Sequence, residues 1–326
     1  MYKFTLEYLK SIPKDEFIHW TGTHVGPGTG KWGFNKGHIW NDKLVEFLNL
    51  NPDITFIQDS QDGNKDWISR YFEENKIIIA TNDDAGIMRI TDRTVSGVNG
   101  TLQDNINYYL KNSKKNINLK SNELYILTSP YPNGGTFPRV YDIFNAFNVK
   151  RIYSKGLMCT DNQKLKPLPN GLCNITIEPI REKILFKEKK INDNLVVYNF
   201  RLGTNKERDK ILNYYNDKEW ATEGKGRQFE YLREMYHHKF VISPESNCAD
   251  SHRTWEAIYL GAIPIVQKTS GMSWFQDLPI LQVDDMCSLT KEYLEDKYEE
   301  MMSKEYNLDK LKISYWLNKI QNDIKR

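Results

Sequence analysis

Short apolar runs alternate with longer amphipathic stretches along most of the chain after residue 42. The short runs are rich in Ile, Leu and Val, which favour buried strands, and turn residues flank many of them. Predicted strands are residues 54–57, 77–80, 124–127, 151–153, 165–168, 195–200, 240–242, 263–266 and 280–283. Predicted helices are residues 42–50, 67–74, 102–110, 140–147, 252–260, 271–278, 291–302 and 308–324. This alternation predicts an α/β fold with a parallel sheet that helices cover on both faces.

The polar loop after residues 240–242 carries most of the candidate chemistry. The strand stops at Ser243-Pro244, because proline has no N–H to donate to a central sheet. Asp250 or Ser251 is suited to cap the helix that follows, and a glycine ends that helix. A helix that begins at the carboxyl end of a parallel strand is a common anion site, since its N-terminus carries about half a positive charge.

Two charged residues at the start of this helix are suited to a nucleotide. Arg253, in the first turn, can donate two hydrogen bonds to a phosphate, and Glu256, on the same helix face, can accept from two ribose hydroxyls. The alternative is that Arg253 and Glu256 pair with each other on an exposed face. The polar density of the loop favours nucleotide binding. The candidate binding residues are Ser243, Glu245, Asn247, Asp250, Ser251, His252, Arg253, Thr254 and Glu256.

Residues 240–266 resemble the donor-binding signature of exostosin-like glycosyltransferases. The shared pattern is Phe-x-x-Ser-Pro-x-x-Asn-x-x-Asp-x-His-Arg-x-Trp-Glu-x-x-x-x-Gly-x-x-Pro-Ile-Val, without a gap. The stretch is more distantly similar to the donor motif of α-1,3-fucosyltransferases, in which a Glu-Asn-Ser loop precedes a Thr-Glu-Lys helix start. Arg253-Thr254-Trp255-Glu256 stands at that helix start here, which favours the exostosin-like family.

The resemblance implies the GT-B architecture, in which two Rossmann-like domains face each other across a cleft and a C-terminal helix returns to the first domain. It implies an N-terminal acceptor-side domain at residues 1–172, a linker at 173–193 and a nucleotide-sugar-binding domain at 194–326. Residues 168–171, Leu-Pro-Asn-Gly, are similar to the interdomain element of such enzymes.

The loop after the first predicted strand of the nucleotide domain offers further candidates. Thr204, Asn205 and Arg208 resemble the family's loop at this place, so they join the candidate donor-binding residues. Arg208 lies in the first turn of the following helix, from which an arginine can reach a diphosphate. The alternative is an exposed ion pair with Glu207 or Asp209, an equally common arrangement for such a residue.

The sequence lacks the Asp-x-Asp pattern that binds a metal-diphosphate in metal-dependent glycosyltransferases. We therefore expect no metal and no cofactor besides the nucleotide sugar, with the leaving diphosphate stabilised by the helix dipole, backbone N–H groups and arginine. Retaining two-domain glycosyltransferases carry two glutamates at a set spacing, and Cys248 stands where the first would lie. An inverting reaction is therefore expected, with a general base from the first domain. The candidates for this base, in order, are Asp83, Asp59 and His24.

These three candidates also have ordinary interpretations. Asp59 and Asp83 each follow a predicted strand, where ligands of parallel sheets gather, but such residues also form simple turns. His24 lies in a glycine-rich stretch at residues 21–33, which does not match a phosphate-binding Walker loop. A mobile loop near an acceptor and a plain connection both fit this stretch.

Composition narrows the classes of partner and compartment. The 45 basic and 43 acidic residues nearly cancel, so neither nucleic acid nor a membrane surface is indicated as a partner. Four cysteines without a CxxC pair argue against a disulfide scaffold or a zinc site and favour a reducing compartment. No apolar run approaches the length of a membrane span, so we expect a cytoplasmic protein. Abundant Asn, Lys and Ile indicate an AT-rich genome, bacterial or viral.

The sequence thus predicts an inverting, metal-independent glycosyltransferase. The enzyme would move a hexosyl or pentosyl group from a UDP- or GDP-linked donor to a glycan or saccharide acceptor, in glycan biosynthesis. Two alternatives stay open: a non-catalytic protein that binds nucleotide sugars or glycans, and a nucleotide-sugar epimerase of the same fold.

Overall fold

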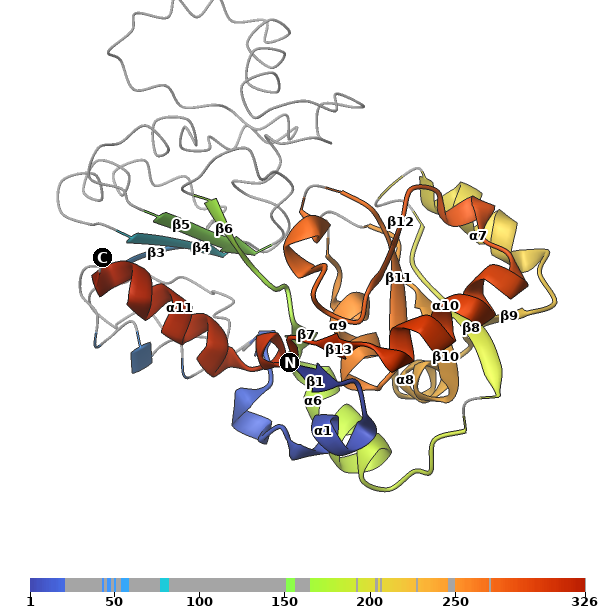
Figure 1. The fold of residues 1–326 in the computed structure, drawn as a ribbon, viewed down its shortest axis with the longest axis horizontal. Helices are drawn as coiled ribbons and strands as arrows, with labels where there is room; N and C mark the ends of the chain where they lie inside the picture. The colour runs from blue at the N-terminus through green and yellow to red at the C-terminus, as the bar shows by residue number, and fades with distance from the viewer. Residues whose placement is uncertain are drawn as a thin grey trace, which may run out of the picture. The chain divides into compact units, whose positions relative to one another are not determined.

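The structure is a computed structural model, and Figure 1 shows its fold coloured along the chain. It describes residues 1–20, 43, 46–47, 50, 54–58, 77–81, 151–155, 165–191, 193–202, 205, 207–226, 228–245, 250–269 and 271–325. The chain divides into two compact units. The first unit is Met1–Thr21 with Pro169–Lys319, and the second unit is Gly22–Leu168 with Ile320–Arg326.

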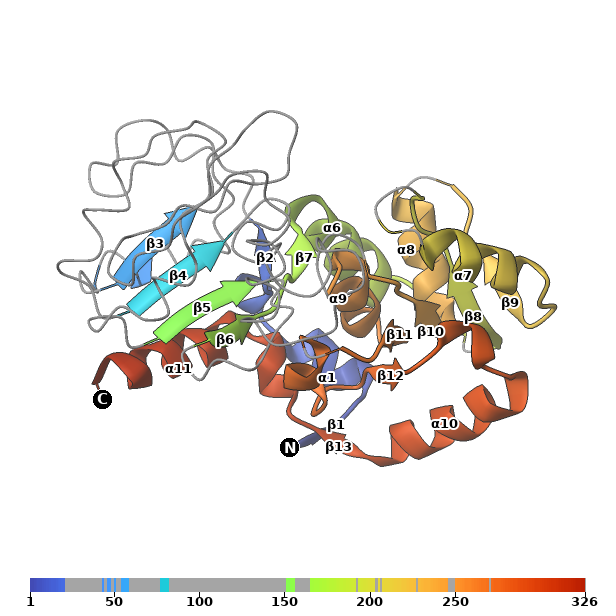
Figure 2. The same ribbon diagram turned by 90° about the horizontal axis from the view of Figure 1, so that it is seen from above.

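A five-stranded parallel sheet forms the centre of the first unit, in the order β12-β11-β10-β8-β9 (Figure 2). Its strands are β8 (Asn194–Tyr198), β9 (Ala221–Glu223), β10 (His238–Ile242), β11 (Ile263–Gln267) and β12 (Leu281–Val283). Phe240, Val241 and Ile242 follow one another in β10 and are all fully buried. Burial of successive residues is expected for a parallel strand that is covered on both faces. The predicted α/β fold with a parallel sheet is confirmed.

Helices connect these strands by the crossovers that a parallel sheet requires. They are α7 (Glu207–Asn216), α8 (Gln228–His237) and α9 (His252–Tyr259), with α10 (Lys291–Ser303) after the last strand. The connection from β8 through α7 to β9 runs in one direction across the sheet, and the connection from β10 through α9 to β11 runs in the other. Because such crossovers are right-handed, α7 and α9 cover opposite faces. The sequence pattern had not indicated β9 or α8.

The N-terminal residues pack within the first unit. Strand β1 (Tyr2–Lys3) pairs antiparallel with β13 (Glu305–Tyr306), and β2 (His19–Trp20) pairs parallel with β7 (Leu172–Cys173). Between them lie α1 (Leu6–Ser11) and the short helix η1 (Lys14–Glu16). The Phe17 ring stacks on that of Tyr259, with 4.6 Å between centroids. The domain boundaries predicted at residues 172 and 194 stay predictions.

Short helical segments complete the first unit. They are α6 (Asn174–Glu178), which runs into the π-helical segment η3 (Pro179–Leu185), and the single turns η4 (Met272–Phe275), η5 (Met286–Ser288) and η6 (Leu308–Leu311). The helix predicted at 271–278 is thus only the turn η4. The helix predicted at 308–324 is instead η6 followed by α11 (Ile313–Lys325).

A four-stranded parallel sheet lies in the second unit, in the order β3-β4-β5-β6. Its strands, β3 (Ile54–Gln58), β4 (Ile77–Thr81), β5 (Arg151–Lys155) and β6 (Leu165–Leu168), confirm four predicted strands. The end of α11 belongs to this unit, where Asp323 accepts a 2.7 Å hydrogen bond from the Tyr153 hydroxyl and lies 3.5 Å from Arg151 Nε. The strand predicted at 124–127 and the helices at 67–74, 102–110 and 140–147 lie outside the described residues.

Candidate functional site

The candidate site lies where the strand order of the five-stranded sheet reverses. Strand β8 comes first along the chain, β9 lies on one side of it, and β10 begins the progression to the other side. In doubly wound sheets, ligands bind at the carboxyl edge at such a reversal, because the connections on its two sides diverge to opposite faces. Here Phe200 follows the carboxyl end of β8 by two residues, and the loop at residues 243–245 directly follows β10.

The N-terminus of α9 follows the loop after β10. Ser251 occupies the cap position with extended backbone angles, φ −105° and ψ 162°, but its hydroxyl makes no capping bond. Instead the Ser243 hydroxyl oxygen lies 3.1 Å from that of Ser251 and 2.9 Å from that of Thr254. The Ser251 hydroxyl thus makes no capping bond to the first turn of α9, and a helix N-terminus of this kind favours an anion.

Two guanidinium groups flank one aromatic ring beside this helix start. The Cζ atoms of Arg208 and Arg253 lie 5.7 and 5.9 Å from the centroid of the Phe200 ring. Arg253 also donates a 3.0 Å hydrogen bond from Nε to the Tyr231 hydroxyl. Within the described ranges, neither arginine makes a salt bridge. Burial, and second the positive charge of Arg253, lower the pKa of Arg208 to about 10. Two neighbouring guanidinium groups are an arrangement that suits a bound anion.

Arg208 holds two loops of the carboxyl edge together. Its side chain is buried and donates from Nε to the Glu245 carbonyl (2.8 Å), from Nη2 to the Pro244 carbonyl (3.1 Å) and from Nη1 to the Arg201 carbonyl (2.7 Å). The alternative of an exposed pair with Glu207 or Asp209 is therefore not the arrangement found. Arg208 joins the loop after β8 to the loop after β10, and so it positions the site.

Glu256 is buried one turn inside α9. This residue is only 8% exposed, and burial raises the pKa of its carboxyl group to about 6, against the opposing effects of the nearby Arg253 and Thr176. No salt bridge joins Glu256 to Arg253 in the part of the chain that the structure describes. The alternative of an exposed Arg253–Glu256 ion pair is therefore not what the fold contains. A buried carboxylate without a salt bridge among the described residues is suited to accept hydrogen bonds from the hydroxyl groups of a ligand.

A connecting segment, residues 169–190, fastens both ends of α9. At the start of the helix, the Asp250 carboxylate accepts from the Asn170 N–H (2.6 Å) and from Trp255 Nε1 (2.7 Å). His252 Nδ1 donates to the Gly171 carbonyl (2.7 Å), since a carbonyl can only accept. Asp250 therefore anchors the segment, and Ser251 occupies the cap position.

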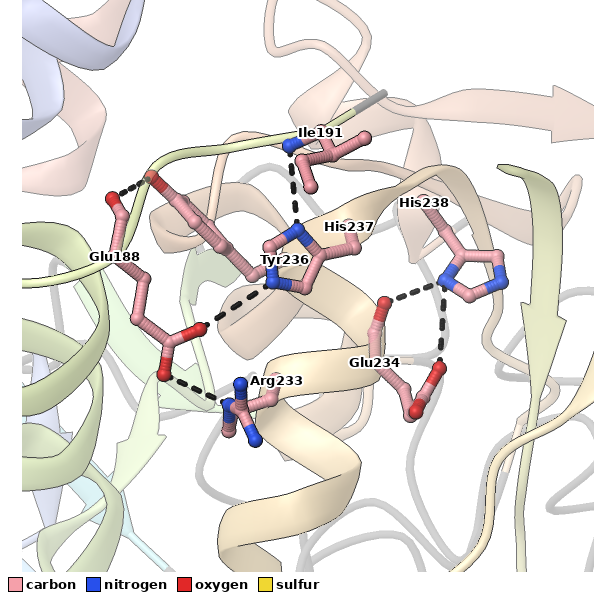
Figure 3. A network of polar contacts seen from close by, with 7 residues as sticks. All are labelled: Glu188, Ile191, Arg233, Glu234, Tyr236, His237 and His238. Atoms are coloured by element: carbon pink, nitrogen blue, oxygen red, sulfur yellow. Dashed lines mark hydrogen bonds and ion pairs between the residues drawn. The ribbon is translucent and has the colours of Figure 1, made fainter. Parts of the chain in front are cut away.

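At the other end of α9, Lys190 Nζ donates to the carbonyls of Leu260 (3.2 Å) and Gly261 (2.5 Å). A cation at a helix C-terminus is favourable, although burial lowers the pKa of Lys190 to about 7. Figure 3 shows how the neighbouring Glu188 is held against α8: its carboxylate lies 2.7 Å from Arg233 Nε and 3.3 Å from His237 Nε2. The connecting segment is thus fixed along its length.

Gly171 is the tightest point of this segment. Its φ is +70°, in the left-handed region that favours glycine, and a Cβ atom there would lie 2.6 Å from the Ile18 carbonyl oxygen. Glycine is therefore required for the Leu-Pro-Asn-Gly stretch to pass so close to the N-terminal residues.

The predicted donor-binding residues fall into three groups. Ser243, Glu245, Ser251, Thr254, Arg208, Arg253 and Glu256 come together at the carboxyl edge, and Asp250 and His252 bind the connecting segment. Asn205 precedes α7, and its side-chain oxygen accepts a 3.0 Å hydrogen bond from the Glu207 N–H. Asn247 and Thr204 lie outside the described residues, as do the three candidates for the general base, Asp83, Asp59 and His24.

Several residues of the site had no assignment from the sequence. Phe200 directly follows a predicted strand, so its place at a carboxyl edge was a usable signal. Tyr231 and Thr176 come from elements far along the chain, and neither lies in a motif. Only their contacts with Arg253 and Glu256 identify them.

A comparison of the sequence with protein-family models and with curated proteins finds no match. Within the described ranges, no group of three or more His, Cys, Asp and Glu side chains is placed to hold a metal. Over the same residues, every helix is too short or too polar to cross a membrane.

Proposed function

We propose that this chain is a glycosyltransferase that binds a UDP- or GDP-linked sugar at the carboxyl edge of its five-stranded sheet. One observation carries the proposal: Arg253, in the first turn of α9, lies beside a second guanidinium at the reversal of strand order. This combination is suited to a diphosphate, because helix N–H groups and a guanidinium fork both favour phosphate oxygens.

The proposed roles follow from position. Arg253 and the first N–H groups of α9 bind the diphosphate and stabilise the charge that develops as the sugar departs. Glu256, one turn further along α9, accepts from the ribose hydroxyls. Arg208 holds the two loops in place. The resemblance to exostosin-like enzymes supports inversion without a metal ion, with Asp83, Asp59 or His24 as the general base that deprotonates the acceptor hydroxyl.

The architecture proposed with this function is GT-B, with two Rossmann-like domains facing each other across a cleft and the C-terminal helix returning to the first domain. Two separate parallel sheets, one of five and one of four strands, support the proposal. The reversed strand order of the five-stranded sheet supports its assignment as the nucleotide-binding domain.

Incubation with radiolabelled UDP- and GDP-sugars, with and without EDTA, tests the proposal. Slow donor hydrolysis that EDTA leaves unchanged is the expected result. Interconversion of sugars would identify an epimerase, and binding without turnover would identify a non-catalytic binding protein. Loss of turnover in EDTA, with recovery in Mn²⁺, would overturn the metal-independent mechanism.

A further inference from the structure

Tyr231 holds the guanidinium of Arg253 by one particular nitrogen. The Nε–H group of Arg253 donates a 3.0 Å hydrogen bond to the Tyr231 hydroxyl oxygen. The Arg253 Cζ atom lies 5.9 Å from the centroid of the Tyr231 ring and 5.9 Å from that of the Phe200 ring. Because Tyr231 lies on α8 and Arg253 on α9, the bond joins two helices of the first unit. A residue of a neighbouring helix thus orients the guanidinium of the proposed donor site.

The Tyr231 ring is itself fixed at the carboxyl edge of the sheet. It lies against Gly224, which directly follows β9. The Gly224 N–H donates to the Tyr198 carbonyl (2.9 Å), and the Gly224 carbonyl accepts from Asn199 Nδ2 (2.6 Å). A Cβ atom at Gly224 would lie 2.8 Å from Cδ2 of Tyr231, closer than Cβ atoms approach other atoms. The absence of a side chain at Gly224 therefore gives the ring room against the end of β9.

Counting the donors of Arg253 shows which side of the guanidinium is open to a ligand. An arginine has five N–H groups, one on Nε and two on each terminal nitrogen, in a fixed planar fork. Among the described residues, the Nε–H is the one that has a hydrogen-bond partner. A phosphate can be bound side-on, by Nε and one terminal nitrogen, or end-on, by both terminal nitrogens. The bond to Tyr231 engages Nε and so favours the end-on geometry.

The Tyr231 hydroxyl orients Arg253 without cancelling its charge. Burial raises the pKa of this hydroxyl to about 12, so it stays protonated and neutral near pH 7. A carboxylate in the same place would also accept from Nε, but its negative charge would oppose a phosphate. A neutral acceptor leaves the positive charge of Arg253 available to a diphosphate.

We propose that Tyr231 is a positioning residue for the diphosphate of the donor, which holds Arg253 by Nε so that the two terminal nitrogens bind a phosphate end-on. This inference rests on the proposed function. Tyr231 acts through Arg253 and does not itself touch the ligand. A guanidinium that is already oriented loses less conformational freedom when the ligand binds, so affinity rises without a further contact.

The first test needs no ligand. The Nε–H signal of Arg253, assigned by its absence in Arg253→Lys, is observed by ¹H–¹⁵N NMR in the full chain, and its rate of exchange with water is measured. Tyr231→Phe keeps the ring but removes the acceptor, so we expect exchange to be roughly fivefold faster, the factor that one such hydrogen bond is worth. An equal exchange rate in Tyr231→Phe and wild type would overturn the proposal.

Tyr236→Phe is the matched control on the same helix. It removes the 3.1 Å hydrogen bond from the Tyr236 hydroxyl to the Glu188 carbonyl, at the amino edge of the sheet. We expect the Nε–H of Arg253 to exchange at its wild-type rate in this variant. Equal acceleration in Tyr236→Phe and Tyr231→Phe would mean that loosening of α8, and not the Tyr231 hydroxyl, sets the rate, which also overturns the proposal.

The second test is a double-mutant cycle on nucleotide affinity. Binding of UDP and GDP is measured by calorimetry for wild type, Tyr231→Phe, Arg253→Ala and the double variant. If Tyr231 acts through Arg253, Tyr231→Phe should weaken binding roughly fivefold in the wild-type background and less than about twofold in the Arg253→Ala background. The same loss in both backgrounds would mean that Tyr231 contributes independently of Arg253, and the positioning role would be wrong.

The NMR signals of the nucleotide-bound protein test the end-on geometry. On saturation with UDP or GDP, we expect the terminal nitrogens of Arg253 to shift more than Nε, because they meet the phosphate. A larger shift at Nε than at the terminal nitrogens would overturn end-on binding. If neither nucleotide binds, the proposed function fails, while the exchange rates of the ligand-free protein still decide whether Tyr231 holds Arg253.

Discussion

The five-stranded sheet has a polar cluster at each edge, and the charges of the two clusters are balanced differently. At the amino edge, where β10 begins, Glu188 lies 2.7 Å from Arg233 Nε and 3.3 Å from His237 Nε2 (Figure 3). At the carboxyl edge, Arg208 and Arg253 share the Phe200 ring and form no salt bridge within the described residues. At the amino edge Glu188 and Arg233 form an ion pair, whereas at the carboxyl edge neither arginine forms one with a described residue, although Glu256 lies nearby.

This difference separates a structural cluster from a candidate binding site. Partly buried charges that meet opposite charges need no further partner, whereas neighbouring buried cations raise the free energy of the empty fold. An anion that binds between them recovers part of that cost. Two neighbouring arginines without an ion-pair partner among the described residues, and not the number of polar residues, therefore mark the carboxyl edge as the place for a ligand. Substitutions at the two edges should therefore differ in their effects on stability and on nucleotide affinity.

Arg208→Ala should have the largest effect, and on stability. Three backbone carbonyls would lose their donor, so we expect the protein to be about 3 kcal/mol less stable to unfolding, with nucleotide binding lost as the loops separate. Urea denaturation measures the change. Arg201→Ala, in the same loop but exposed, is the control and should change stability by less than about 0.5 kcal/mol. Equal effects of the two substitutions would contradict the positioning role of Arg208.

Arg253→Ala should weaken binding with little effect on stability. Loss of a charge-assisted contact to phosphate should reduce affinity for UDP or GDP by about 2–3 kcal/mol, on the order of thirtyfold or more. Arg253→Lys should restore little, since an ammonium group lacks the planar fork. Calorimetry measures the affinity, with Arg233→Ala at the amino edge as the control that should bind normally. Unchanged affinity in Arg253→Ala would remove Arg253 from the site.

Glu256→Gln and Glu188→Gln should change stability in opposite directions. The unfolded Glu256 ionises near 4.5 and the folded one near 6, so the fold is destabilised as pH rises through this window. Glu256→Gln should therefore stabilise the protein at pH 7.5 by about 2 kcal/mol, a gain that disappears below pH 4.5. Glu188→Gln should destabilise it by about 1 kcal/mol, because Arg233 loses its ion-pair partner. Denaturation midpoints at pH 7.5 and 4 check both, and destabilisation by Glu256→Gln at pH 7.5 would contradict the assignment.

Tyr231→Phe should have the smallest effect. The substitution removes the acceptor of the 3.0 Å bond from Arg253 Nε, so the guanidinium is oriented less well. We expect a loss of about 1 kcal/mol in nucleotide affinity, roughly fivefold, without a change in stoichiometry. Tyr236→Phe, on the same helix but at the amino edge, serves as the control in the same calorimetric assay. A loss as large as that of Arg253→Ala would mean that Tyr231 itself contacts the ligand.

Apolar runs were a reliable guide to the strands of both sheets. Residues 240–242 and 263–266 are buried on both faces, so their apolar character is continuous and easily recognised. The apolar pattern did not predict strand β9, because its three residues, Ala221–Glu223, lie at the edge of the sheet and two of them are exposed. The cap of α9 was narrowed to Asp250 or Ser251, and the fold placed Ser251 there because Asp250 binds Trp255 and Asn170.

The sequence alone determined the α/β class, the start of α9 and the position of Arg253 and Glu256 on one face of that helix. Each of these follows from local rules: burial period, capping chemistry and helical spacing. Only the tertiary structure decided that Arg208 is buried among three carbonyls, and that Asp250 accepts from the Asn170 N–H. Most of these contacts join residues that are far apart in the chain, and the local sequence does not indicate which distant donor forms a hydrogen bond with a given acceptor.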